Sequence, residues 1–232
     1  MTDMSATNIV FLLFPGVTQL DFTAPAQALS RMPGAVVAGA ASSLAPIATD
    51  SGFAIVPTHD FASAPQADIL CVPGGHGVAE ALGDAATIHF IARQAARAAW
   101  VTSVCTGAFL LGRAGLLAGK RATTHWAYTH LLPLVGAEHQ PGRVVEDGQI
   151  VTSGGVTSGL DFALTLIARL KGAAVAQAIQ LAIEYDPAPP FAGGHPDRAP
   201  DAVTTGLKQR VYDAAAARME AALRGEGVIV LD

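Results

Sequence analysis

An α/β fold with a mostly parallel central sheet is predicted by two features of the sequence. Short apolar runs alternate with longer, alanine-rich segments of helical pattern, and this alternation is typical of an α/β sandwich. The apolar runs are also continuous, as expected for strands buried on both faces of a parallel sheet. The runs that we assign to strands are Asn8–Phe14, Ala35–Ala40, Asp68–Val72 and Trp100–Val104.

Helices are expected between these strands and after the last of them. A β-hairpin is expected in "VVEDGQIVTS", because its Asp147-Gly148 pair is favoured in tight turns between strands. The segments that we assign to helices lie near Ala24–Ser30, Ala86–Ala98, Thr106–Leu117 and Val156–Leu170.

The carboxyl-terminal part of the chain differs in composition from the rest. Tyr185–Pro200 is rich in proline and glycine, which excludes a regular element and predicts an arm. A last helix is expected over Asp201–Arg224. We therefore expect an α/β domain over residues 1–184 and, over residues 185–232, a proline-rich arm and C-terminal helix that pack on the same domain.

The last helix carries apolar side chains near helical spacing, with most of its charges on other faces. This pattern predicts that the helix packs on the core or across a two-fold interface, and the latter would make a dimer. The apolar positions are Val203, Leu207, Val211, Ala214 and Ala221.

Composition argues against several classes of function. Hydrophobic residues make up 51% of the 232 residues and charged residues only 14%, which is typical of a compact, core-rich fold rather than a disordered chain. The formal net charge is −5, and the chain has no basic run. We therefore expect neither nucleic acid nor a membrane surface as a partner.

The sequence also indicates where the protein works. Cys71 and Cys105 both lie in apolar stretches, which favours a reducing compartment over a disulfide framework. The first residues, "MTDMSATN", lack the basic region of a signal peptide. The longest uncharged stretches, Met4–Leu20 and Met32–Thr49, are interrupted by proline, glycine and polar residues, so neither predicts a membrane-spanning helix. We expect a cytoplasmic protein.

Cys105 stands where a predicted strand gives way to a predicted helix. Ser103 and Gly107 place small residues two positions before and after it, as in the nucleophile elbow of α/β-hydrolases. The dipole and amide donors of a following helix favour the thiolate, which is the reactive form. The alternative is that Cys105 is a small buried hydrophobic residue, and this is how we interpret Cys71.

Two further segments are candidates for the same site. "VPGGHGV", Val72–Val78, ends a strand in two glycines, whose amides could form an anion hole or merely an ordinary turn. Asp21 is the only charged residue between Asp3 and Arg31. It could cap a helix, or it could be a partly buried carboxyl with a raised pKa that carries a proton at neutral pH.

The histidines do not form a metal-binding pattern. No pair has the HxxxH spacing, and the two cysteines do not have the spacing of a zinc site, so we expect no metal. His125, in "ATTHW", could reach Cys105 from a neighbouring strand end.

Taken together, these segments resemble the ThiJ/PfpI-like, class I glutamine amidotransferase-like superfamily. The motifs that carry the resemblance are "FPGVTQLDFTAP", "DILCVPGGHGV", "SVCTGAFLLGRAGLLAGKRATTHW" and "VTSGGVTSGLDFALTLI". It implies a flavodoxin-like three-layer sandwich, a homodimer and no cofactor. It also implies that Cys105 is the nucleophile, that Asp21 is its carboxylate, and that Gly75 and Thr106 form a backbone hole.

Within that superfamily, the chain resembles the branch that hydrates isonitriles. This resemblance extends through "EYDPAPPFAGGHPDRAP" and so spans nearly the whole chain. It implies a small-molecule isonitrile substrate and an N-substituted formamide product. Cys105 would form a thioimidate intermediate, and Asp21 would alternate between acid and base.

Two other classes of function remain as alternatives. One is another cysteine enzyme of the superfamily, such as an amidase, a glyoxalase or a deglycase. Thr106 follows Cys105 where protease- and amidotransferase-like relatives often use histidine, which argues against a peptidase or amidase. The other is a non-catalytic redox or ligand sensor, because the cysteine block also resembles the sensor half of AraC-type regulators. Such regulators continue into a basic helix-turn-helix pair, whereas we expect one helix here.

Overall fold

A seven-stranded sheet forms the centre of the computed structural model, which describes residues 6–225. Its strands lie in the order β10-β11-β7-β6-β1-β2-β5. β10 and β11 are antiparallel and every other neighbouring pair is parallel, so the predicted mostly parallel sheet is confirmed. The strands are β1 (Thr7–Leu12), β2 (Ala35–Ala41), β5 (His59–Asp60), β6 (Ile69–Val72), β7 (Trp100–Val104), β10 (Val144–Asp147) and β11 (Ile150–Ser153).

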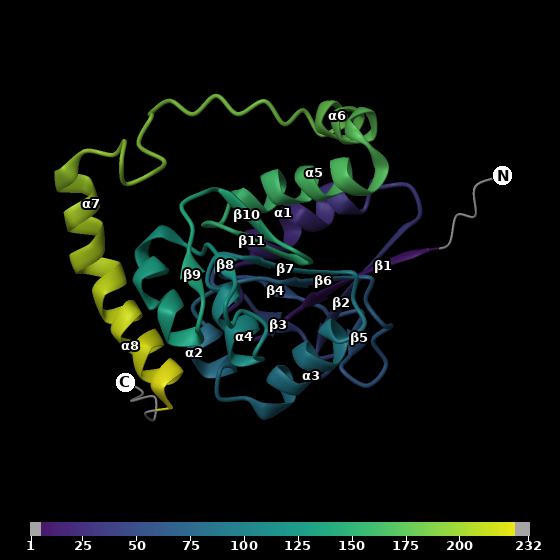
Figure 1. Cartoon of the computed structure of the whole chain (residues 1–232), viewed down its shortest axis with the longest axis horizontal. Coiled ribbons are helices and arrows are strands. Elements are labelled where there is room, and N and C mark those ends of the chain that lie inside the picture. Colours follow the sequence, from purple (N-terminus) through teal and green to yellow (C-terminus); the bar gives the residue numbers. More distant parts are fainter. Residues whose placement is uncertain (1–5, 226–232) are drawn as a thin grey trace.

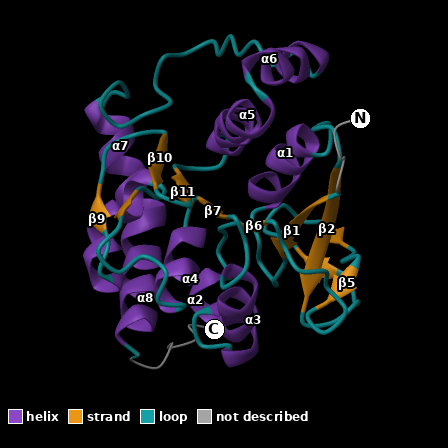
Figure 2. Cartoon of the chain, turned by 45° about the vertical axis from the view of Figure 1, so that its right-hand side comes forward, coloured by secondary structure: helices purple, strands orange, loops and turns teal. Residues whose placement is uncertain are grey.

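Helices cover both faces of this sheet. Figures 1 and 2 show α1, α5 and α6 on one side, and α2, α3 and α4 on the other. The flavodoxin-like three-layer sandwich is therefore confirmed. The first layer consists of α1 (Gln19–Leu29), α5 (Ser158–Lys171) and α6 (Ala173–Ala182), and the second of α2 (Val78–Ala81), α3 (Ala85–Ala95), α4 (Gly107–Arg113) and the 3₁₀-helix η1 (Trp126–Val135).

The two helical layers explain why β1 is continuously apolar from Ile9 to Leu12. Ile9 and Phe11 belong to the hydrophobic cluster under α1 and α5, whereas Val10 and Leu12 belong to the cluster under α2, α3 and α4. Successive side chains of a strand point to opposite faces, and here both faces are covered. A continuous apolar run is the result.

Several elements differ from the sequence pattern. η1 and α6 are missed by it, and α1 begins at Gln19 rather than near Ala24. α6 follows a break at Gly172, whose φ is 89°, and most of its residues are exposed although its sequence is largely apolar. The predicted hairpin is confirmed, because Asp147 pairs with Ile150. Two further pairs of short strands flank the main sheet: β3 (Ile47–Ala48) with β4 (Ala54–Ile55), and β8 (Arg121–Ala122) with β9 (Glu138–His139).

The C-terminal helix consists of α7 (Asp201–Leu207), a π-helical turn (Lys208–Tyr212) and α8 (Asp213–Arg224). In Figure 1 it runs along one side of the sandwich, and α8 packs against α2 and η1. The predicted face does not pack on the core of its own chain, because Val203 and Val211 are exposed; packing of that face across a two-fold interface stays a prediction. The π-turn holds more residues than an α-turn, so it rotates the following residues to another face. The side chains that pack are instead Ala216, Met219 and Ala222.

The remaining expectations concern the ends of the chain and the membrane. Across residues 6–225, no helix combines the length and the apolar character that crossing a membrane requires. Residues 1–5, on which the signal-peptide prediction partly depends, lie outside the described residues, as do residues 226–232 of the predicted C-terminal segment.

Candidate active site

Cys105 occupies a sharp turn between β7 and α4. Its φ is 57°, a left-handed conformation that costs a non-glycine residue about 1–3 kcal/mol. Its amide donates to the carbonyl oxygens of Ser153 (3.1 Å) and Gly154 (2.9 Å), so neighbouring backbone holds this conformation. A Cβ on Gly107 would lie 2.1 Å from the carbonyl oxygen of Val72, which explains the small residue after the turn. The structure therefore contains the predicted strand–elbow–helix geometry.

Asp21 lies in the first turn of α1 and is completely buried. Its Oδ2 accepts a hydrogen bond of 3.0 Å from the Gly74 amide, and its Oδ1 has no hydrogen-bond partner among the described residues. Burial raises the pKa of Asp21 to about 7, although the Gly74 amide lowers it. The helix-capping interpretation is wrong, because Thr18 occupies the N-cap position.

The thiol of Cys105 differs from the sequence-based expectation. Its pKa is raised well above the usual value, first by burial and then by the charge of Asp21. The amides of Thr106 and Val156 favour the thiolate but do not outweigh these effects. This direction is opposite to the lowered thiol pKa that the elbow pattern predicts, since burial penalises any charge here. The site instead holds a neutral thiol beside a carboxyl group that titrates near neutrality.

The glycine turn after β6 lies beside the elbow, and Gly75 contacts Thr106. However, the Gly75 amide donates to Thr106 Oγ1 at 3.1 Å, so it orients that hydroxyl rather than standing free. Gly75 has a φ of 144°, and a Cβ there would lie 2.4 Å from the carbonyl oxygen of Gly16. The amides that point to the cysteine sulfur belong to Thr106 and Val156. Val156 is missed by sequence reasoning, although "SGGVTSG" marks a glycine turn before α5.

His125 lies next to the site but faces aromatic rings. Its Nε2 is 3.4 Å from the hydroxyl oxygen of Tyr212, and burial lowers its pKa to about 4, so the ring is neutral at pH 7. Burial, followed by the charge of Cys105, raises the pKa of Tyr128 to about 12 and also raises that of Tyr212. Both phenols are therefore close to the thiol. Sequence reasoning missed both, because Tyr212 comes from the C-terminal helix and no local pattern connects it to Cys105.

Cys71 and the remaining histidines are not part of this arrangement. Cys71 is buried within β6, and burial raises its pKa to about 12, which suits an inert core residue. Within residues 6–225, no group of three or more histidine, cysteine, aspartate or glutamate side chains is placed to hold a metal ion.

The chain is a flavodoxin-like sandwich with a cysteine elbow and a buried carboxyl at the carboxyl ends of its parallel strands. Residues 7–169 match the model of the DJ-1/PfpI family. The chain belongs to the DJ-1/PfpI family.

Three relatives show how far the similarity extends. The chain is 49% identical over 215 residues to isonitrile hydratase from Pseudomonas putida, covering 93% of this chain and 94% of that one. The crystal structure of a ThiJ/PfpI family protein from Pseudomonas syringae superposes with a TM-score of 0.92 at 40% identity, covering 95% of this chain and 91% of that one. The transcriptional regulator GbdR from Pseudomonas aeruginosa is 31% identical over 139 residues, which cover 58% of this chain and 37% of the regulator.

Proposed function

We propose that this protein is an isonitrile hydratase, which adds water to the terminal carbon of an isonitrile and releases an N-substituted formamide. The observation that carries the proposal is the buried Asp21 carboxyl, which titrates near neutrality beside the Cys105 thiol. An isonitrile carbon needs a nucleophile and a proton together, and this pair supplies both. The similarity to the Pseudomonas putida isonitrile hydratase along nearly the whole chain supports the same activity.

In the first step, Cys105 Sγ adds to the isonitrile carbon. Asp21 takes the thiol proton as the carbon–sulfur bond forms and delivers it to the same carbon. The product is a thioimidate, R–N=CH–S–Cys105, which contains all the atoms of the isonitrile and the thiol. The Asp21 oxygen suited to this transfer is Oδ1, because Oδ2 accepts the Gly74 amide. A pKa of about 7 lets the carboxyl both accept and donate at neutral pH.

In the second step, water adds to the thioimidate carbon. Asp21 takes one proton from the water and transfers it to the nitrogen, which gives the adduct R–NH–CH(OH)–S–Cys105. The carbon–sulfur bond then breaks, the hydroxyl proton returns to the sulfur by way of Asp21, and R–NH–CHO leaves. Thr106 and Val156 stabilise negative charge that develops on sulfur through their amides, while Gly75 orients the Thr106 hydroxyl.

Isonitrile turnover tests this function directly. We expect loss of the isonitrile absorbance and appearance of the formamide by NMR, with no activity in Cys105→Ala. No turnover with any isonitrile offered, together with hydrolysis of an amide or conversion of a reactive carbonyl, would replace the proposal with another cysteine chemistry. Oxidation of Cys105 without any turnover would instead favour a redox sensor.

The homodimer is a second part of the proposal. Leu181 of α6 and Phe191 of the arm are each 81% exposed, which is unusual for large apolar side chains. The arm between α6 and α7 loops away from the rest of the chain in Figure 1. A second copy that covers these surfaces would account for both features. We also propose a cytoplasmic location, because Cys71 and Cys105 are both unpaired.

Light scattering at micromolar concentration tests the dimer. We expect twice the mass of one chain, and we expect Phe191→Asp to shift the protein toward the mass of one chain because it places a charge in the interface. His139→Asp, at an exposed position of β9, serves as the control and should leave the mass unchanged. A single-chain mass for the unmodified protein would remove the dimer.

A further inference from the structure

The carbonyl group of Cys105 receives a buried hydrogen bond from outside its own turn. Thr124 Oγ1 donates to the Cys105 carbonyl oxygen at 2.7 Å, and Thr124 is almost completely buried. Since the Cys105 amide is held by β11 and the loop after it, both peptide groups of the strained residue are tied to neighbouring segments. Any rotation of the Cys105 backbone toward ordinary dihedral angles must break one of these bonds.

Thr124 is itself held in place by the segment that carries it. The preceding residue, Thr123, donates its amide to Thr152 Oγ1 of β11 at 2.8 Å, and this bond is buried. On the following side, His125 caps η1 by accepting the Ala127 amide at its Nδ1. The hydroxyl of Thr124 is therefore presented from a segment that is fixed on both sides.

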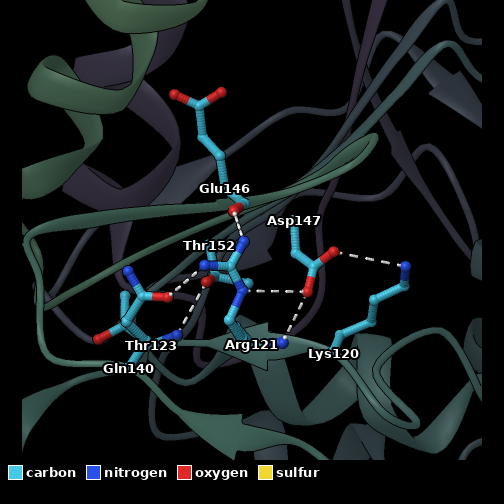
Figure 3. Close-up of polar contacts among 7 residues, drawn as sticks. All are labelled: Lys120, Arg121, Thr123, Gln140, Glu146, Asp147 and Thr152. Atoms are coloured by element: carbon cyan, nitrogen blue, oxygen red, sulfur yellow. Dashed lines mark hydrogen bonds and ion pairs between the residues drawn. The ribbon is translucent and has the colours of Figure 1, made fainter.

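A polar network at the surface fixes the start of the same segment (Figure 3). Arg121 is at its centre: the Arg121 amide donates to Asp147 Oδ2 at 3.0 Å, and its guanidinium donates to the hairpin and to Gln140, which follows β9. The partners of Arg121 and of the neighbouring lysine join β8 to the β10–β11 hairpin. The residues of the network are Lys120, Arg121, Gln140, Glu146 and Asp147.

We propose that Thr124 is a positioning residue for the reaction: its hydroxyl holds the Cys105 backbone in the left-handed conformation that aims the thiol at Asp21. The inference rests on the proposed function, because isonitrile turnover is the reaction to be measured. The hydrogen bond from Thr124 to the Cys105 backbone does not depend on that function. Without this hydrogen bond, the elbow relaxes and Sγ moves away from Asp21 Oδ1 and from the amides of Thr106 and Val156. Displacements of about 1 Å at a reacting atom can lower rates about 100-fold.

The test compares three variants by kcat, KM and melting temperature. Thr124→Val keeps the shape of the side chain and removes the hydroxyl, and we expect kcat to fall about 10- to 100-fold with little change in KM. Thr124→Ser restores the hydroxyl, and we expect it to keep at least about a third of kcat. The matched control is Thr102→Val, because Thr102 Oγ1 also donates to a buried carbonyl oxygen, that of Leu70 at 3.1 Å, from β7 itself. It should lower the melting temperature but retain kcat.

A second measurement does not depend on isonitriles. The rate at which iodoacetamide modifies Cys105, followed by mass spectrometry of its peptide, should change at least about three-fold in Thr124→Val and stay unchanged in Thr102→Val. If the unmodified protein does not hydrate isonitriles, the proposed function fails while this measurement still decides the role of Thr124. Unchanged kcat and alkylation in Thr124→Val, or losses in Thr102→Val as large as those in Thr124→Val, would overturn the inference. If Thr124→Val does not fold, Thr124→Ala takes its place. In that case, a kcat of Thr124→Ser as low as that of Thr124→Ala would overturn the inference.

Discussion

At the scale of single residues, burial raises the pKa of both Cys105 and Asp21. Neither group ionises readily in this environment, because burial raises both pKa values. A buried pair of this kind resists losing its proton to solvent, so the proton stays between sulfur and carboxyl. In the proposed reaction that proton is transferred to the isonitrile carbon.

The first prediction separates the two cysteines. Cys105→Ala should abolish turnover and leave the protein folded, because the side chain is small and lies at the edge of the core. Cys71→Ala should keep turnover and lower the free energy of unfolding by about 1 kcal/mol, because Cys71 is buried in β6. Turnover and thermal unfolding of both variants check this. Equal loss of turnover in two folded variants would contradict the assignment of the nucleophile.

The second prediction concerns proton transfer. Asp21→Asn keeps an oxygen that accepts the Gly74 amide but removes the titrating group. General acid–base groups typically contribute about 10²- to 10⁴-fold to the rate, so we expect kcat to fall by that factor. Cys105 should still react with iodoacetamide, which serves as the control for an intact elbow. Near-native turnover would mean that Asp21 carries no proton.

Part of the site can be predicted from local patterns, and part of it cannot. The flanks of Cys105, the glycine turn and the isolated Asp21 are each visible in a few adjacent residues. The amide of Val156 and the hydroxyl of Thr124 are not, because they reach Cys105 only through tertiary packing. The pKa of the Cys105 thiol also depends on tertiary packing. The local pattern predicts that the helix dipole stabilises the thiolate, but burial by distant elements outweighs this effect and raises the pKa.

At the scale of elements, the elbow requires close contact between α4 and β6. Gly107, the first residue of α4, has no room for a side chain, because a Cβ would overlap the carbonyl oxygens of Val72 and Pro73 at 2.1 and 2.7 Å. Both contacts are with backbone, which cannot rotate away as a side chain can. The approach of α4 to the sheet therefore determines where Cys105 sits.

The third prediction tests this contact. Gly107→Ala should lower the free energy of unfolding by at least about 2 kcal/mol, and it should lower turnover because α4 moves away from β6. Gly83→Ala is the matched control, since a Cβ there meets only the carbonyl oxygen of Glu80 at 3.4 Å. Chemical denaturation and turnover of both variants provide the comparison. A Gly107→Ala protein as stable and active as the control would contradict the requirement for glycine.

The strands of the main sheet are predicted well because burial on both faces leaves a continuous apolar run. The C-terminal helix is predicted less well, for a physical reason. A regular helical count along Val203, Leu207 and Val211 selects one face, but the π-turn changes the phase before α8 begins. The buried face then follows Met219 instead, which no periodic count through the turn would identify.

At the scale of the whole molecule, the carboxyl of Asp21 makes folding depend on pH. Its pKa is 3.8 without burial and about 7 in the folded protein, where burial is the largest cause. Between these values the folded protein holds a proton that the unfolded chain releases. The free energy of unfolding should therefore decrease as pH rises from about 4 to about 7, by an amount on the order of 4 kcal/mol, and stay constant above that range.

The last prediction isolates this contribution by a difference between variants. Asp21→Asn cannot ionise, so its stability relative to the unmodified protein should increase as pH rises from 4 to 7. Asp147→Asn should show the opposite sign, and only below about pH 4, because the Arg121 amide lowers the pKa of Asp147 below 3.8; from pH 4 to 7 its difference should stay nearly constant. Denaturant unfolding at several pH values and one fixed protein concentration gives both differences. If the Asp21→Asn difference does not vary with pH, folding does not raise the pKa of Asp21, and the carboxyl lacks the near-neutral pKa by which it both accepts and donates a proton in the proposed reaction.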